Sequence, residues 1–356
     1  MVFGDFFAGI GGFRLGLEAV GYKCAYSAEW NESAQQTYSQ NFGSGFDASD
    51  ISKLKSIPQL DLITAGFPCQ PYSIAGKRNG LSDKRSQPFF KLMDLVRARK
   101  TPVLLLENVP NLVSIQNGSA FREILKTIED SGYQAHCDIL DAADFGVPQK
   151  RKRLFIVAFH SDLGDIKFEF PDPKHNSVPV KSILESGDYS IPISEKWQTY
   201  IDLYQGKVTL EQIGFDVPKT RKALERADPD ADLENCIFQM RSSGIRALSV
   251  EKALPTFAVS ISGGGAMIPV YSKERRHLSL LEMQRIMGFP DSWTFPVART
   301  HAIKQLANSV CPPVVSAIGK AINTSLKSHS VYSTSRADIL SSMSSPVGLT
   351  TFEVSG

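Results

Sequence analysis

Short apolar runs alternate with amphipathic segments along the first 160 residues of the chain. The runs have the length and composition of strands, whereas the segments between them place apolar residues at helical spacing. This alternation predicts an α/β fold with a doubly wound, mostly parallel sheet and helices on both of its faces. The expected strands are Val2–Phe7, Lys23–Glu29, Leu60–Phe67, Val103–Val109, His136–Leu140 and Leu154–Phe159, and the expected helices are Phe13–Val20, Asn31–Gln40 with Asn31 as N-cap, Pro88–Arg99 and Phe121–Ser131.

The pattern changes after Ser161, where prolines cluster and the periodicity weakens, which predicts a second, smaller and more irregular domain. Helical spacing returns at Leu278–Met287. A strand at Ala302–Leu306, a turn and a helix at Val314–Ile322 would then return the chain to the first domain. Beyond Lys327 the Ser/Thr-rich sequence predicts a flexible tail. The expected organisation is a catalytic and cofactor-binding domain at 1–172, a recognition domain at 173–300, a returning segment at 301–326 and a tail at 327–356.

The composition narrows the class of protein only slightly. Hydrophobic residues make up 42% of the chain, and no apolar run is long enough to span a bilayer. The amino terminus does not resemble a secretory leader, and the five scattered cysteines argue for reduced thiols in the cytoplasm, without disulfides or structural zinc. A net charge of +2 does not by itself indicate a nucleic-acid partner. Several basic clusters are either solvated faces or, if they converge on one cleft, a footprint for phosphates.

Cys69 follows Pro68 directly after the apolar run that ends at Phe67. Proline has a fixed φ and favours extended geometry in the residue before it, so the chain would leave the sheet stiffly. The thiol would then lie just beyond the carboxyl end of a strand, where open α/β sheets carry their chemistry. This position makes Cys69 a candidate nucleophile, although free cysteine is also a common buried filler.

Gly9, Gly11 and Gly12 occupy the turn between the first strand and the first helix. Glycines in this turn allow a ligand to approach the backbone closely. Glu29 closes the second strand, where a carboxylate commonly binds ribose hydroxyls, and Asp50 could bind an adenine amino group. Each acid alone could be a surface carboxylate. Together they favour a nucleoside-bearing cofactor that needs no phosphate clamp.

Glu107 ends another apolar strand, where a buried carboxyl needs partners or a raised pKa, as suits an acid that holds a proton near neutral pH. If its strand neighbours the strand before Cys69, both residues face one cleft. Arg151 and Arg153 precede a further strand and alternate with period two. They are either a surface basic patch or two guanidinium groups directed at an anion or carbonyl.

Taken in order, these motifs resemble those of the S-adenosylmethionine-dependent DNA cytosine carbon-5 methyltransferases. The resemblance runs from residue 3 to about residue 322 and implies a Rossmann-like methyltransferase domain with a separate target recognition domain. The motifs are Phe-Ala-Gly-Ile-Gly-Gly, Pro-Cys-Gln, Glu-Asn-Val, Gln-x-Arg-x-Arg, the series Arg276-x-Leu…Glu282…Arg285…Gly-Phe-Pro, and Asn-Ser-Val.

The resemblance implies a role for each reacting group. Cys69 would attack carbon-6 of a flipped cytosine, and Glu107 would protonate ring nitrogen-3. Arg153, with Arg151, would contact the cytosine carbonyl and hold the site together. The cofactor would be S-adenosyl-L-methionine, without a metal. The implied cofactor-binding residues are Phe7, Gly9, Ile10, Gly12, Glu29, Trp30, Asp50, Ile51, Pro68, Asn308, Ser309 and Val310, and the implied DNA-binding residues are Gln70, Ser73 and Thr256.

Two departures from the family pattern concern cofactor affinity rather than the reaction. Pro88 replaces an apolar residue that usually touches the cofactor, and Ala307 replaces a glycine before Asn308. The expected substrate is double-stranded DNA, methylated by a monomer that could be the modification half of a restriction system with a cognate endonuclease. A tRNA cytosine-5 methyltransferase on the same fold is the alternative.

Overall fold

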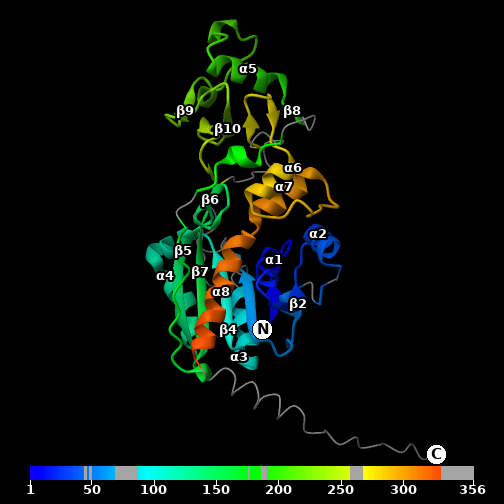
Figure 1. Ribbon diagram of the computed structural model, residues 1–356, viewed down its shortest axis with the longest axis vertical. Helices are drawn as coiled ribbons and strands as arrows, with labels where there is room; N and C mark the ends of the chain where they lie inside the picture. The colour runs from blue at the N-terminus through cyan, green and yellow to red at the C-terminus, as the bar shows by residue number, and fades with distance from the viewer. Residues whose placement is uncertain are drawn as a thin grey trace, which may run out of the picture.

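Two six-stranded sheets organise the chain, shown in the computed structural model of Figure 1. The structure describes residues 1–43, 46–47, 50–68, 87–174, 177–185, 191–256 and 268–329. The larger sheet has the strand order β2-β1-β3-β4-β7-β5. Its strands are β1 (Val2–Phe6), β2 (Lys23–Ala28), β3 (Leu62–Gly66), β4 (Val103–Asn108), β5 (Tyr133–Asp141) and β7 (Lys152–His160).

The larger sheet is mostly parallel. Strands β1 to β4 run in one direction, and β7 is antiparallel to both β4 and β5. A parallel sheet needs helices on both faces, because each crossover packs a helix against it. The predicted α/β class and doubly wound, mostly parallel sheet are therefore confirmed.

Strand β4 shows how both faces of this sheet are buried. Leu104 and Leu106 pack on the face covered by α3 (Gln87–Arg99) and α4 (Ser119–Glu129). Val103 and Leu105 pack on the opposite face, against α1 (Gly12–Glu18) and α8 (Pro312–Ser328). All four leucine and valine side chains are fully buried. The strand consequently reads as a continuous apolar run instead of an alternating one.

Helix α8 comes from the far end of the chain and completes the first domain. The Tyr22 hydroxyl donates to the carbonyl of Gly319 at 2.9 Å, and the Ser316 hydroxyl donates to that of Gly16 at 2.7 Å. A Cβ placed on Gly16 would lie 2.6 Å from the carbonyl oxygen of Pro312, so α1 and α8 pack at closest approach. The residues between β7 and α7 (Arg299–Asn308) thus separate two segments of the chain that pack together on one face of the larger sheet.

The second sheet belongs to the smaller domain, at the opposite end of the molecule from the larger sheet (Figure 1). Helix α5 (Glu195–Tyr204) packs on one face through Trp197 and Ile201, against Phe238 and Ala247 of the sheet. The strand order of this second sheet is β8-β14-β13-β10-β11-β9. Its strands are β8 (Ile191–Pro192), β9 (Leu224–Ala227), β10 (Cys236–Met240), β11 (Ile245–Ser249), β13 (Val270–Tyr271) and β14 (Arg276–His277).

Two connections join the domains. Strand β12 (Leu254–Pro255) pairs in parallel with β6 (Gln149–Lys150), just before β7 begins. On the other side, Arg276 of β14 makes a bidentate pair with Glu282 of α6 (Leu280–Ile286), with N–O distances of 2.7 and 2.8 Å. Both side chains are almost completely buried, so removing one partner would leave the other as a buried charge without a counter-charge.

The chain departs from the sequence prediction at Ala302–Leu306. We predicted a strand there, and that prediction is wrong, because these residues lie within the helix α7. The buried residues Ala302, Ile303 and Leu306 follow helical spacing, but a short apolar run does not distinguish a strand from a helix. The predicted N-cap of α2 (Glu32–Phe42) is confirmed, since the Asn31 side chain accepts from the Ala34 N–H at 3.0 Å.

Helix α8 continues to Ser328, into the predicted tail, and residues 330–356 lie outside the described part of the chain. None of the helices in the described ranges is long and apolar enough to cross a membrane.

Candidate active site

Glu107 and Arg153 form an ion pair where β4 ends beside the start of β7. The Arg153 Nε lies 2.9 Å from Glu107 Oε1, and each side chain is 16% exposed. Burial raises the pKa of Glu107, while the guanidinium groups of Arg153 and then Arg151 oppose that rise. The site therefore holds a carboxyl group that is oriented by an arginine and inclined to keep its proton.

The end of β3 lies directly against this pair. Gly66 is opposite Glu107 in the parallel register, and a Cβ on Gly66 would lie 3.5 Å from Glu107 Oε2. The buried Asn108 side chain donates from Nδ2 to the Phe67 carbonyl at 3.1 Å. The exposed Pro68 follows at once. The residues that precede Cys69 are thus held beside Glu107, as expected if the two strands are neighbours.

The candidate nucleophile and two of the predicted DNA-binding residues belong to a segment that is not described. Cys69, Gln70 and Ser73 lie outside the described residues. Their assignments remain predictions.

Arg151 occupies the break between β6 and β7 and points to backbone atoms of another segment. Its Nη2 donates to the carbonyls of Ala307 and Ser309 at 2.7 and 2.9 Å. Its own N–H donates to Asp141 Oδ1 at 2.7 Å. Burial, followed by the charge of Arg153, lowers the pKa of Arg151 to about 10. In this structure Arg151 holds the turn before α8 in place.

The glycine turn after β1 is fastened to Glu29 at the end of β2. Glu29 Oε2 accepts from the Gly9 N–H and Oε1 accepts from the Asn31 N–H, each at 2.8 Å. Gly9 has φ of 55° and Gly11 has φ of 85°, in the left-handed region that favours glycine. The glycine turn and the Glu29 carboxylate, which were predicted to act together, therefore lie in contact.

Ser309 and Val310 pack closely against the glycine turn that follows β1. A Cβ on Gly12 would lie 2.6 Å from Ser309 Oγ and 2.7 Å from the Val310 carbonyl oxygen. Only a residue without a side chain allows this approach. By contrast, a Cβ on Gly9 would meet no atom of the described residues within 4 Å, so that part of the chain leaves the space beside Gly9 open.

The residues predicted to bind a nucleoside differ in exposure. Trp30 is 75% exposed and presents its ring to solvent, whereas Ile51 is buried. The Asp50 carboxylate accepts from the Ser52 N–H at 2.9 Å, and this hydrogen bonding lowers the pKa of Asp50. Ile10 as a whole is only 1% exposed and packs in the core beneath the turn.

Three further residues were predicted to bind the cofactor or DNA. Phe7, with φ of 54°, is half-buried at the start of the glycine turn, and Asn308 is exposed at the end of α7. Thr256 lies in the smaller domain and contacts β6: its N–H and hydroxyl both donate to the Lys150 carbonyl, at 3.0 and 2.8 Å.

Sequence reasoning missed two supporting residues. Asn108 fixes the Phe67 carbonyl, and Asp141 fixes the backbone of Arg151. Asn108 could have been found from its place directly after Glu107, at the carboxyl end of a buried strand. Asp141 carries no comparable signal, because its partner is a main-chain N–H ten residues further along the chain.

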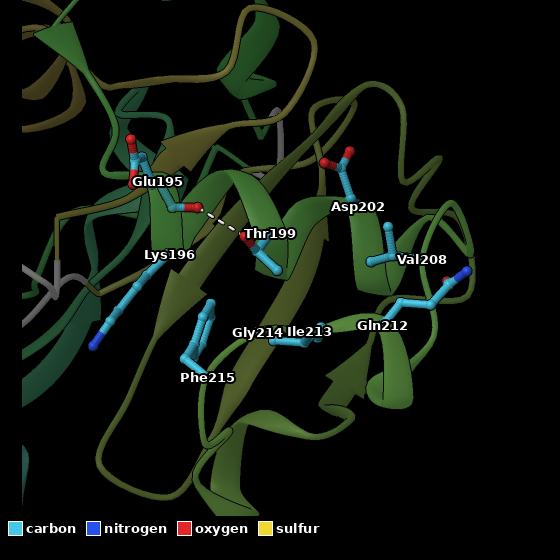
Figure 2. Close-up of a pocket in the computed structure, with 9 residues that line it drawn as sticks. All are labelled: Glu195, Lys196, Thr199, Asp202, Val208, Gln212, Ile213, Gly214 and Phe215. Atoms are coloured by element: carbon cyan, nitrogen blue, oxygen red, sulfur yellow. Dashed lines mark hydrogen bonds between the residues drawn. The ribbon is translucent and has the colours of Figure 1, made fainter.

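A separate cavity of about 390 Å³ lies in the smaller domain, between α5 and the loop that ends at Phe215 (Figure 2). Thr199 on its wall donates to the Glu195 carbonyl at 3.0 Å, and the Lys196 ammonium lies 5.5 Å from the centre of the Phe215 ring. None of the residues predicted for the active site lines this cavity. The chemistry of the predicted residues gathers instead at the carboxyl edge of the larger sheet.

Comparisons with known proteins show which family the chain resembles over nearly its whole length. The model of the C-5 cytosine-specific DNA methylase family matches residues 1–324. The type II methyltransferase M.HhaI of Haemophilus parahaemolyticus is 35% identical over 325 residues, which are 90% of this chain and 94% of that protein. M.MspI of a Moraxella species is 36% identical over 91% of this chain and 70% of its own length. The solved structure of the Entamoeba histolytica methyltransferase EhMeth covers 92% of this chain and 98% of its own, with a TM-score of 0.63 and 20% identity.

Proposed function

This chain belongs to the C-5 cytosine-specific DNA methylase family, and on that premise we propose that Cys69, Glu107 and Arg153 carry its reaction. The protein is a DNA (cytosine-5-)-methyltransferase. It transfers a methyl group from S-adenosyl-L-methionine to carbon-5 of a cytosine in DNA. The observation that carries the assignment of residues is the ion pair of Glu107 and Arg153 beside the exit of β3.

In the proposed mechanism the target cytosine leaves the helix, because its carbon-6 cannot be reached in a stacked duplex. The Cys69 thiolate forms a bond to carbon-6, and the protonated Glu107 shares its proton with nitrogen-3, so that negative charge does not build up on the ring. Arg153 orients Glu107 through their 2.9 Å contact and would contact the cytosine carbonyl. Bound S-adenosylmethionine would supply an electrophilic methyl group to carbon-5 and would leave as S-adenosylhomocysteine. Transfer of the carbon-5 proton to water would then break the bond to Cys69 and restore the thiolate.

The open space at Gly9 is where the proposed cofactor site begins. Glu29 already fixes the turn and would bind the ribose, while the exposed ring of Trp30 is available to stack on adenine. Ser309 and Val310 would close the methionine end, in the position that Arg151 maintains.

The reaction is tested with labelled S-adenosylmethionine and separate pools of duplex DNA and tRNA. We expect label on DNA, at carbon-5 of cytosine, and none with Cys69→Ser. DNA carrying 5-fluorocytosine should trap the wild-type protein covalently, because fluorine cannot leave as a proton does, and should not trap Cys69→Ser. Label surviving in that variant would refute the mechanism.

The substrate alternative is separated by the same assay. Family membership supports DNA, and label confined to tRNA would instead favour a tRNA methyltransferase. We further propose a role in restriction-modification, supported by relatives that are themselves named type II methyltransferases. DNA methylated by this protein should then resist one site-specific endonuclease and remain sensitive to others.

A further inference from the structure

Arg299 is a half-buried arginine at the first residue of α7. Its Nη2 donates to the Leu278 carbonyl at 2.7 Å. Among the described residues neither Nε nor Nη1 has a hydrogen-bond partner; Nε is enclosed by the protein, and Nη1 is not. The guanidinium is therefore held in one orientation, with the end that carries Nη1 still available.

The charge of Arg299 is not balanced by a carboxylate in the described part of the chain. Arg276 of the same region pairs with Glu282 at 2.7 Å. Arg285 likewise pairs with Asp291 at 2.6 Å. Burial lowers the pKa of Arg299, and no acidic group of the described residues opposes that change. Because a partly buried cation without a counter-ion is costly, the arrangement favours an anionic ligand.

His277 lies close enough to Arg299 for the two side chains to interact. It belongs to β14, directly before Leu278, and its Nδ1 is 3.2 Å from the Ile268 carbonyl oxygen. Burial lowers the pKa of His277, the Ile268 carbonyl opposes that change, and the positive charge of Arg299 adds to it. The surroundings of Arg299 therefore disfavour further positive charge, which a negative ligand would counter.

The position of α7 brings this arginine near the proposed catalytic centre. The helix lies between the larger sheet and the smaller domain (Figure 1). Its ten residues, Arg299–Asn308, span roughly 15 Å at about 1.5 Å per residue. Its far end leads into Ser309, whose carbonyl accepts from Arg151 at 2.9 Å. Duplex DNA carries about one negative charge per 1.7 Å of its axis, so several phosphates beside a flipped cytosine would lie within such a distance.

We propose that Arg299 binds one backbone phosphate of the DNA duplex near the target cytosine. This inference rests on the proposed DNA methyltransferase function. A guanidinium can bind a phosphate through two parallel hydrogen bonds, and the contact with Leu278 already orients the side chain. A phosphate contact fixes the register of a protein on the duplex without reading a base. Arg299 would thus contribute equally to the affinity for every DNA sequence.

The test measures binding to a duplex that contains a site methylated by the protein, with S-adenosylhomocysteine present. Each phosphate near the target cytosine is replaced in turn by an uncharged methylphosphonate. At one position the replacement should weaken binding of the wild type by about tenfold or more, as a lost charge-assisted contact does. The same replacement should leave the affinity of Arg299→Gln nearly unchanged. The slope of the logarithm of affinity against that of salt concentration should also be shallower by about 0.9 in this variant.

Lys304→Gln is the matched control, because Lys304 is exposed on the same helix and its loss removes an equal charge. This variant should keep the wild-type response at that phosphate. If the wild type and Arg299→Gln respond alike at every phosphate, the inference is overturned.

Arg299→Lys serves as the second variant if Arg299→Gln does not fold, since lysine keeps the charge and lacks the planar fork. Its response at the same phosphate should be smaller than that of the wild type, and an undiminished response at every phosphate would likewise overturn the inference. Failure of the wild type to methylate any DNA would overturn the proposed function itself.

Discussion

The side-chain amide of Asn108 donates to the main-chain carbonyl of Phe67 at 3.1 Å, which ties the end of β4 to the end of β3. Cys69 follows Phe67 by two residues, and Glu107 directly precedes Asn108 on β4. The hydrogen bond therefore fixes the distance between Phe67, which precedes the proposed nucleophile by two residues, and the end of the strand that carries the proposed acid. Its contribution is one of position and not of direct contact with a base.

Asn108→Ala should slow methylation by roughly tenfold, because a lost buried hydrogen bond costs on the order of 1 to 3 kcal/mol. The loss should lie in kcat and in the rate of covalent trapping on 5-fluorocytosine DNA. The KM for S-adenosylmethionine should change less than kcat, since Asn108 contacts the Phe67 carbonyl and makes no hydrogen bond with the glycine turn in the described part of the chain. Steady-state kinetics and a gel assay of the trapped complex measure both quantities. A rise in KM with an unchanged trapping rate would contradict this role.

Glu107 should set the alkaline limit of activity. Its protonated form is the proposed donor, and burial raises its pKa, so activity should be present at low pH and decline as the pH rises through that value. Glu107→Gln cannot transfer a proton and should lose at least about 100-fold in kcat. The remaining rate should no longer decline on the alkaline side. A pH profile that is the same in both proteins would exclude Glu107 as the acid.

Removing Arg153 should move that alkaline limit. The guanidinium opposes the raised pKa of Glu107, so Arg153→Gln should raise that pKa further and shift the alkaline limb to higher pH. The rate itself should also fall, because Glu107 loses its 2.9 Å orienting contact. Lys152→Ala is the control, as Lys152 is the exposed neighbour of Arg153 on the same strand. If the alkaline limb of the pH profile moved to lower pH in Arg153→Gln, the guanidinium of Arg153 would not be lowering the pKa of Glu107.

Arg151→Ala should weaken cofactor binding more than it slows the chemical step. Without its donors the carbonyls of Ala307 and Ser309 lose a charge-assisted contact, and the wall beside Gly12 becomes free to move. We expect the dissociation constant for S-adenosylhomocysteine, measured by calorimetry, to rise by about tenfold or more. A kcat that falls while this constant stays unchanged would instead assign Arg151 to the cytosine.

Asp5 should make the stability of the protein depend on pH. This carboxyl is fully buried on β1, and burial raises its pKa from 3.8 to about 8, against the opposing hydrogen bond from Thr64. A pKa that is higher in the folded state favours folding at low pH, and that advantage is lost as the pH rises from about 4 to about 8. The free energy of unfolding should fall by up to about 1.4 kcal/mol per pH unit in this range.

Asp5→Asn cannot ionise and should flatten this dependence. Urea unfolding at a series of pH values compares the two proteins. Equal slopes in the wild type and the variant would mean that another group is responsible.

The elements that pack through periodic apolar residues could be predicted from the sequence. Strand β4 is an example, because its four buried aliphatic residues require helices on both faces. The short run Ala302–Leu306 could not be assigned correctly, since its length suits either element and its true state depends on packing beside α6.

The proposed reacting groups remain predictions, which the sequence allowed because their chemistry is visible in residue type and motif order. The supports of the site were not predicted. Arg151 binds main-chain carbonyls 156 and 158 residues away, and a backbone carbonyl has no residue type that a sequence could reveal. The same holds for Asn108 and the Phe67 carbonyl. Positioning contacts of this kind become visible only once the topology is known.

The packing of α1 against α8 also sets the order in which the protein can fold as it is made. The Tyr22 hydroxyl donates to the carbonyl of Gly319, which is synthesised 297 residues later. Translation proceeds at about 5–20 residues per second, so the face of the large sheet beneath α8 stays uncovered for tens of seconds after β1 emerges. The smaller domain is synthesised in that interval and can form first. The glycine turn of the proposed cofactor site, which Ser309 and Val310 approach closely, is then completed last, so a nascent chain should not bind cofactor until nearly all of it has left the ribosome.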